Sequence, residues 1–248
     1  MFGGGSSISS SSRPWPGVLL ALALLAAACS RASPAAPTAT PTAADFVAVR
    51  FPSADGRATL GGRLYGGGSR SVVLAHMRPA DQRLWEPFAR ELARQGYLVL
   101  TFDFRGYPAS PGPKDDGKVA DDLSGALAFL RGRGVERPAL VGASMGATAS
   151  LAVAADQRVA GVVAISAPPN FAGVDAAAAA PRIGVPVLFL AATADDGYLA
   201  AARRMAATAR DADVLSYDGD EHGQDLVNGD HAREVRAAIE AFLRQVLG

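Results

Sequence analysis

One short sequence, Gly142-Ala143-Ser144-Met145-Gly146, constrains the fold of this chain more than any other feature. It follows an apolar run that ends at Val141, and it precedes a stretch of small residues that continues to Ala155. A serine at a tight strand-to-helix turn has a strained backbone, so the residues two positions away on either side must lack a Cβ atom. The pattern therefore predicts a buried strand, a serine lifted above the sheet edge, and a closely packed helix.

Strand and helix patterns alternate through most of the chain, which indicates an α/β fold with a mostly parallel, doubly wound sheet covered by helices on both faces. An antiparallel hairpin at the start of the domain turns at residues 53–56. Ligands of such sheets bind at the carboxyl ends of the strands, where Ser144 is expected. The expected strands are 46–51, 58–65, 71–75, 97–102, 137–141, 159–165, 187–192 and 212–217, and the expected helices are 85–95, 119–130, 147–155, 199–209 and 231–247.

Composition places the chain among globular proteins and argues against some partners. Hydrophobic residues make up 49% of the 248 residues, charged residues make up 19%, and the formal net charge is zero. No basic surplus is available to neutralise phosphates, so no nucleic-acid partner is expected. Acidic pairs such as Asp121-Asp122 are expected on solvated surfaces. Three scattered histidines give no metal-binding pattern, and we expect neither a metal nor another cofactor.

The N-terminal residues 1–28 have the organisation of a signal peptide. Arg13 is the only cationic side chain there, and the apolar run 17–28 is too short to span a bilayer but suits a signal-peptide core. The only cysteine, Cys29, follows three alanines, and this arrangement resembles the lipobox of bacterial lipoproteins. Ala26 stands where that pattern prefers leucine. The resemblance implies lipidation of Cys29, and a cleaved signal without lipidation remains the alternative.

Residues 29–44 are rich in proline, alanine and threonine and predict an extended tether, because such a composition buries no core. Residues 45–248 then form one folded domain. The resulting expectation is an exported lipoprotein of the cell envelope that is anchored to a membrane, with a secreted protein as the alternative.

A serine nucleophile needs a base, and the base needs an orienting acid. His222 lies in a polar, glycine-containing loop after the last strand, from which it could reach over the sheet, whereas His231 opens the final helix and is the weaker candidate. Asp195 and Asp196 follow the strand that ends near Ala192 and are both candidates for the acid.

Taken together, Val73-Leu-Ala-His76, Phe102-Asp-Phe-Arg-Gly106, the serine turn and His222-Gly223 resemble the α/β-hydrolase fold family, and most closely its small dienelactone-hydrolase-like members. The resemblance implies the chain order Ser144, Asp195, His222 for a catalytic triad, which excludes His76 as the base.

The family pattern also implies an oxyanion hole formed by the backbone N–H of Met145 and a second N–H after His76. That second donor is Arg78 by position, or Met77 if the register shifts by one residue. The chain has His76-Met77 where the family usually has His-Gly, and Pro108 where it usually has a glycine. Asp103 and Arg105 are interpreted as structural.

The segment 166–186 has room for one short helix, around its alanine run, and no cap domain. An uncapped site is open, which favours small or extended ester substrates. The expected activity is that of a serine hydrolase of the carboxylesterase type. A peptidase or acyltransferase with the same triad, or an inactive binding lipoprotein, are the alternatives.

Overall fold

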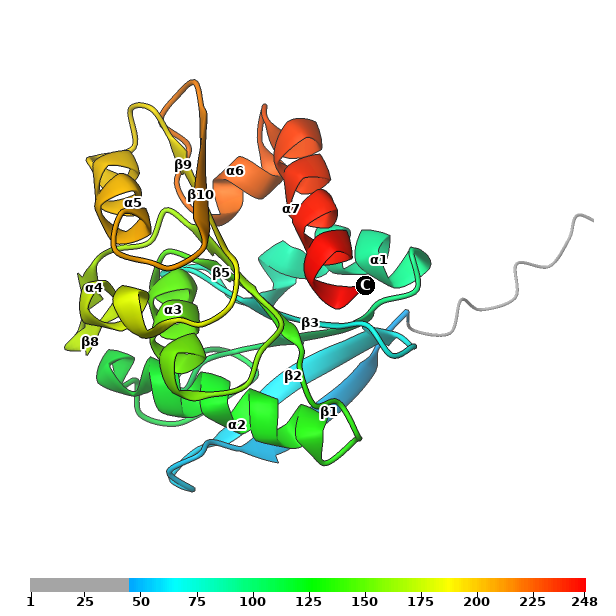
Figure 1. Cartoon of the computed structure of the whole chain (residues 1–248). Coiled ribbons are helices and arrows are strands. Elements are labelled where there is room, and N and C mark those ends of the chain that lie inside the picture. Colours follow the sequence, from blue (N-terminus) through cyan, green and yellow to red (C-terminus); the bar gives the residue numbers. More distant parts are fainter. Residues whose placement is uncertain (1–44) are drawn as a thin grey trace, which may run out of the picture. The chain divides into compact units, whose positions relative to one another are not determined.

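The computed structural model describes residues 45–248, which form an eight-stranded sheet in the order β1-β2-β4-β3-β5-β6-β9-β10 (Figure 1). Strand β2 pairs antiparallel with β1 and β4, and the other neighbours are parallel. The strands are β1 (Val47–Pro52), β2 (Thr59–Gly66), β3 (Ser71–Ala75), β4 (Leu98–Phe102), β5 (Ala139–Ala143), β6 (Val162–Ile165), β9 (Val187–Ala192) and β10 (Ala212–Tyr217).

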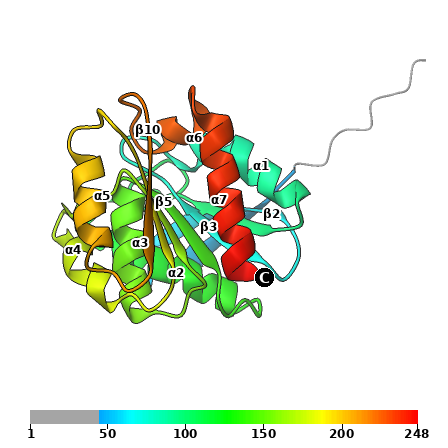
Figure 2. The same ribbon diagram turned by 45° about the horizontal axis from the view of Figure 1, so that its top comes forward.

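Helices cover both faces of this sheet (Figure 2). One face is covered by α1 (Glu86–Arg94), α6 (Gln224–Asn228) and α7 (Ala232–Leu247), whose apolar residues share a core cluster. The second core cluster includes residues of α2 (Val119–Arg131), α3 (Met145–Asp156) and α5 (Tyr198–Ala206). The expected α/β architecture, with its antiparallel start, is confirmed.

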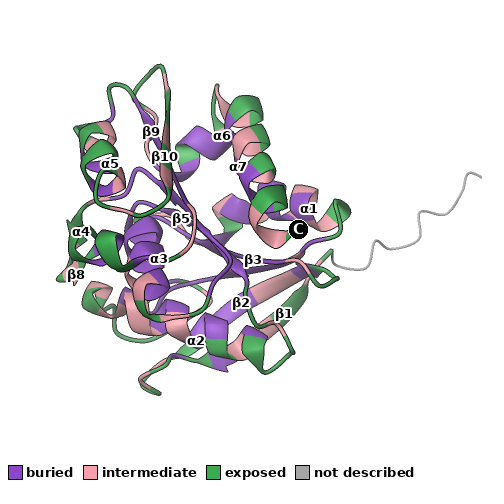
Figure 3. Ribbon diagram, in the orientation of Figure 1, coloured by how far each residue is buried: buried purple, intermediate pink, exposed green. Residues whose placement is uncertain are grey.

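Burial follows from the parallel central strands. All five residues of β3 and all five of β5 are buried, because helices pack on both of their faces (Figure 3). Strand β10 lies at the edge of the sheet and contains only partly buried and exposed residues. The rigid centre of the sheet therefore supports the turn that follows β5.

The segment 166–186 contains only small elements: the two-residue strands β7 (Asn170–Phe171) and β8 (Val174–Asp175), helix α4 (Ala176–Ala179) and a 3-10 turn (Ala180–Arg182). The short helix expected at the alanine run is present, capped by the Asp175 side chain on the Ala178 N–H. Further 3-10 turns span Gln82–Trp85 and Asp116–Lys118.

The expected signal peptide, the expected lipidation site Cys29 and the expected tether lie outside the described residues. Within residues 45–248, none of the helices combines the length and apolar character needed to cross a membrane.

Candidate active site

Ser144 occupies the strained turn that its sequence context predicts. It follows β5 directly and precedes α3, with backbone angles φ 48° and ψ −112°. Its N–H donates to the Ile165 carbonyl at 2.8 Å, which joins the turn to the end of the neighbouring strand β6. Positive φ is costly for a residue with a side chain, so the surrounding structure must hold Ser144 in this conformation.

Two glycines make this turn possible by removing side chains from crowded backbone. A Cβ atom on Gly142 would collide with the carbonyl group of Gly146, and one on Gly146 would collide with the carbonyl groups of Ala75 and His76. Gly146 therefore allows the loop after β3 to approach the first turn of α3. The expected requirement for glycine at both positions is confirmed.

The structure brings His222 and Asp195 together. His222 Nδ1 lies 2.9 Å from Asp195 Oδ1 and 3.1 Å from Oδ2. Asp195 is only 5% exposed, whereas Asp196 is exposed. His231 instead lies with its Nε2 2.6 Å from the Asp218 carbonyl, outside this pair. A carboxylate on Nδ1 fixes the tautomer in which Nε2 is free to accept a proton.

The loop of His222 packs against the ends of β5 and β6. A Cβ atom on Gly223 would be 3.5 Å from Ala143 Cβ, so the residue after His222 lies next to the residue before Ser144. The Gly223 N–H also donates to Ser166 Oγ at 3.0 Å. Ser166 follows β6, is fully buried and has φ 48°. The sequence did not predict that Ser166 would hold the His222 loop, because no motif marks a serine that accepts a hydrogen bond from a distant backbone N–H.

Of the backbone groups expected in an oxyanion hole, that of Met145 directly follows Ser144, and one of the two alternatives for the second donor is already occupied. Met145 is the first residue of α3, where N–H groups lack partners within the helix. In the loop after β3, the Met77 N–H donates to Gln224 Oε1 at 2.8 Å. This leaves Arg78 as the better candidate of the two, in agreement with its position in the family pattern.

His76 has a structural position. It is fully buried, its Nδ1 lies 2.8 Å from the Met77 carbonyl, and its Nε2 accepts the Phe104 N–H at 3.1 Å. Because Nε2 is an acceptor, the proton resides on Nδ1 and donates to Met77. Burial lowers the pKa of His76, which favours this neutral form.

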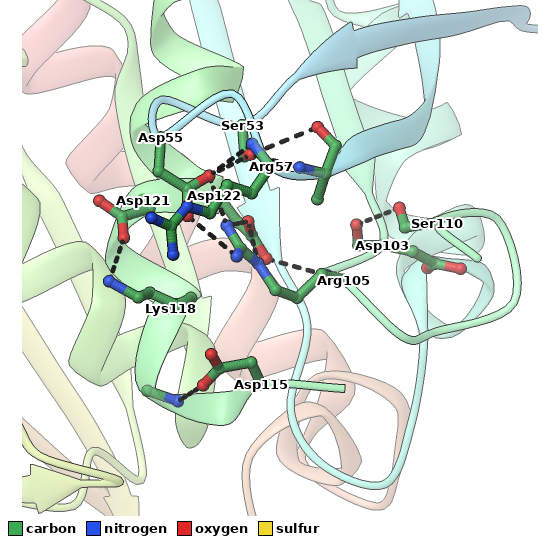
Figure 4. Close-up of polar contacts among 12 residues, drawn as sticks. Ser53, Asp55, Arg57, Asp103, Arg105, Ser110, Asp115, Lys118, Asp121 and Asp122 are labelled. Carbon is green, nitrogen blue, oxygen red and sulfur yellow. Dashed lines mark hydrogen bonds and ion pairs between the residues drawn. The ribbon is translucent and has the colours of Figure 1, made fainter. Parts of the chain in front are cut away.

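Asp103 and Arg105, which follow β4, take part in polar contacts that join several loops (Figure 4). Arg105 donates to Asp122 at 2.6 Å and to Asp55 at 3.0 Å. Asp103 accepts the backbone N–H groups of Gln82 and Ala109 at 2.8 and 2.7 Å. The structural interpretation of Asp103 and Arg105 is therefore confirmed.

For Asp122, the expectation of a solvated surface is wrong. Its carboxylate is fully buried, since Arg105 from the neighbouring loop supplies two hydrogen bonds from its side chain and one from its backbone. Burial raises the pKa of Asp122, whereas the hydrogen bond from Arg105 lowers the pKa of the less buried Asp55 well below its usual range. Burial by itself would lower the pKa of Arg105. The hydrogen bonds from Arg105 to Asp122 and Asp55 outweigh this effect, so the net result is a raised pKa.

Tyr198 covers one side of the histidine. Its ring centroid lies 4.6 Å from that of His222, with the planes tilted by 54°. Burial, with the charges of Asp195 and Asp196, raises the pKa of Tyr198, so the ring presents a neutral phenol. Its position at the start of α5 places it directly after the Asp195 loop.

A cavity of about 550 Å³ opens beside β1 and β2, but neither Ser144, Asp195 nor His222 lines it. Asp103, which does line it, has both carboxylate oxygens engaged by backbone N–H groups. The cavity thus offers no free carboxylate for chemistry. Within residues 45–248, no group of three or more metal-ligating side chains is found.

Comparison with known families identifies the class of protein. The family described as alpha/beta hydrolase fold matches residues 70–213, more than half of the chain, and the chain belongs to this family. Two uncharacterized proteins of Mycobacterium tuberculosis, from strains CDC 1551 and H37Rv, are 30% identical over 101 residues. That match covers 40% of this chain and only 36% of the length of these relatives.

Solved structures share the fold at low sequence identity. The esterase Pf2001 of Pyrococcus furiosus has a TM-score of 0.71 and 18% identity, over 82% of this chain and 91% of that one. An esterase from Exiguobacterium antarcticum has a TM-score of 0.69 and 16% identity, over 80% and 100% of the two chains. A thermophilic esterase from Thermogutta terrifontis has a TM-score of 0.64 and 20% identity, over 82% and 100%. At these identities the likeness concerns the fold.

Proposed function

We propose that the protein is a serine hydrolase of carboxylic esters, with Ser144 as nucleophile, His222 as base and Asp195 as the orienting acid. The observation that carries this proposal is the Asp195–His222 pair, in which Asp195 is buried and the residue after His222 lies next to the residue before a serine strained at φ 48°. Three solved structures with the same fold are described as esterases, which is consistent with this chemistry.

In the proposed reaction, His222 Nε2 takes the Ser144 proton while Oγ attacks the ester carbonyl carbon. The N–H groups of Met145 and Arg78 stabilise the oxyanion. The tetrahedral intermediate collapses as the protonated His222 gives its proton to the leaving alcohol, which leaves an acyl-enzyme. Water, deprotonated by His222, then attacks the acyl carbon. As this second tetrahedral intermediate collapses, the bond to Ser144 Oγ breaks, His222 returns the proton to Oγ, and the acid is released.

We further propose that the site accepts small or extended esters. The support is the size of the segment 166–186, whose regular elements are only two to four residues long. Nothing in that segment has the length of the helices that build a cap over the serine. Substrates whose acyl chains require deep burial are therefore disfavoured.

We also propose a lipid-anchored location in the cell envelope, with the chain attached at Cys29. The support is sequence alone: the apolar run 17–28, the small residues before Cys29 and the proline-rich stretch up to residue 44.

Hydrolysis of p-nitrophenyl acetate, butyrate and octanoate by the full chain and by S144A tests the proposed reaction. We expect turnover of the short esters that S144A abolishes, and labelling of Ser144 by a fluorophosphonate. Folded wild-type protein that neither turns over an ester nor labels would contradict it. Labelling without ester turnover would shift the assignment to a peptidase or acyltransferase.

A further inference from the structure

A buried glutamine joins the histidine loop to the loop after β3. Gln224 is fully buried, and its Oε1 accepts the Met77 N–H at 2.8 Å. In return, the Gln224 N–H approaches Met77 Sδ at 3.3 Å. Because the Met77 N–H is a donor, the amide atom that faces it must be the oxygen, which fixes the orientation of the side chain.

Stability does not explain a glutamine at this position. Gln224 Nε2 is buried and has no hydrogen-bond partner in the described part of the chain. An unpaired buried donor destabilises a fold, whereas an apolar side chain of the same shape carries no such penalty. The bond to Met77 is therefore the feature that distinguishes Gln224 from an apolar side chain such as methionine.

We propose that Gln224 is a positioning residue that aligns the oxyanion hole with the catalytic base. By engaging the Met77 N–H, it fixes the loop after β3 so that the next N–H, that of Arg78, is the one that meets the oxyanion. This inference rests on the proposed function, because it assigns a task to the same site.

The residues next to Gln224 further restrict the contact between the His222 loop and the loop after β3. Gly223, between His222 and Gln224, has φ 58° and is so close to Met77 that a Cβ atom would lie 2.7 Å from Sδ. Its N–H is held by Ser166 at the end of β6. The proposed base and the proposed oxyanion donor are thus connected through the contacts of Met77 with Gly223 and Gln224. A displacement of a catalytic group by about 1 Å can lower the rate of catalysis about 100-fold.

The first test is Q224M, which keeps the length of the side chain and removes the acceptor. We expect kcat/KM for p-nitrophenyl butyrate to fall about 10- to 100-fold, mostly through kcat, because the loss concerns the transition state. The matched control is Q82M. Gln82 is also buried, and its amide binds the Thr101 hydroxyl and the Gly61 carbonyl, away from the serine. Q82M should retain kcat/KM within about 2-fold even if it lowers stability.

A second readout separates alignment from general loosening. Replacing the carbonyl oxygen of the substrate by sulfur weakens its hydrogen bonds to an oxyanion hole. We expect wild type to prefer the ester strongly over the thionoester and Q224M to lose most of that preference. Q224E should restore much of it, because burial favours the protonated carboxyl group, which keeps an acceptor oxygen for Met77. An unchanged preference in active Q224M would overturn the proposal.

A structure of the wild-type protein with an alkyl boronate on Ser144 tests the inference without any variant. We expect the N–H groups of Met145 and Arg78 at about 2.7–3.1 Å from the boronate oxygen, with Met77 still bound to Gln224. A Met77 N–H on the boronate oxygen would overturn the assignment, even if Q224M failed to fold. Wild-type protein without esterase activity would overturn the proposed function itself, whereas active wild type with an equally active Q224M would overturn only the role of Gln224.

Discussion

Two adjacent aspartates differ sharply at the level of the single residue. Asp195 is buried and bonded to His222, and Asp196 points to solvent. We expect D195N to lower kcat by about 10³- to 10⁴-fold, because an amide in place of the carboxylate no longer holds the imidazole in its productive tautomer. D196N, as the matched control, should stay within about 2-fold of wild type. Ester turnover and the rate of fluorophosphonate labelling measure both, and a larger loss in D196N would reverse the assignment.

His76 makes a second prediction at this scale, concerning pH and stability. Its pKa in the folded chain lies below the usual 6.5, since burial disfavours the charged ring. Below pH 6.5 the unfolded chain therefore binds a proton that the folded chain does not. We expect the free energy of unfolding to fall as the pH drops through 6.5, by up to about 1.4 kcal/mol per pH unit from this group.

Urea unfolding between pH 7.5 and 5 measures this dependence in wild type and in H76Q. The variant should be less stable overall but should show a shallower dependence on pH. The charged groups near His76 are Asp103, Asp81 and Lys114, and they are present in both proteins, so the difference in slope isolates the imidazole. Equal slopes would show that His76 does not make this contribution.

At the level of elements, the network of Arg105 connects the loop after β4 to α2 and to the β1–β2 turn. R105M leaves the fully buried Asp122 without its partner, and we expect a loss of about 3–5 kcal/mol in the free energy of unfolding. R83M removes the partner of Asp81 at an exposed position and should leave the free energy of unfolding nearly unchanged. Denaturant unfolding measures both, and R105M/D122L should recover much of the loss. A double variant no more stable than R105M would argue against an unpaired charge as the cause.

The contact between α3 and the loop after β3 depends on one glycine. A methyl group on Gly146 would collide with the carbonyl groups of Ala75 and His76, so G146A should displace the loop that carries Arg78. We expect a loss of about 1–3 kcal/mol in stability and a larger relative loss of activity. Gly184, which has no atoms within 4 Å of an added Cβ, supplies the control G184A. Thermal unfolding and ester turnover together measure the effect, and a G146A as active as G184A would contradict it.

Helices and strands were predicted well where the hydrophobic pattern was long or where glycine and polar residues marked a turn. The strands β3 and β9 match their expected residues, and the hairpin, the serine turn and the final helix are present as expected. Helix α6 was missed, because it has five residues and only two adjacent apolar side chains.

The contacts that complete the site could not be predicted from the sequence. Periodicity does not distinguish a buried Asp122 from a solvated one, because its burial depends on Arg105 arriving from another loop. Nor does it indicate that Gln224 reaches Met77, which is 147 residues away in sequence. Such contacts arise from the packing of loops against one another, for which the sequence carries no local signal.

For the whole molecule, the order of the chain separates the proposed anchor from the proposed catalytic site. Every residue of the proposed site lies between Arg78 and Gln224, inside the part of the chain that the structure describes. We expect a protein of residues 45–248 to fold and to hydrolyse short esters with the same kcat/KM as the full chain, within about 2-fold. A truncated protein that folds but has lost activity would show that the N-terminal residues contribute to the site.

Attachment to a membrane is the complementary prediction for the N-terminal residues. The run 17–28 has 12 residues, fewer than the roughly 20 that a membrane-spanning helix needs, so it does not suffice as an anchor. Acyl chains on Cys29 would supply about 0.8 kcal/mol for each buried CH₂ group, and more than one chain is needed for stable attachment. We therefore expect wild-type protein, expressed in a bacterium, to sediment with the membrane fraction and to incorporate labelled palmitate. C29S should do neither, whereas the neighbouring S30A should behave as wild type. Membrane association of C29S equal to that of wild type would exclude lipidation as the anchor and indicate another mode of attachment, whereas wild-type protein recovered in the soluble fraction would support the secreted alternative.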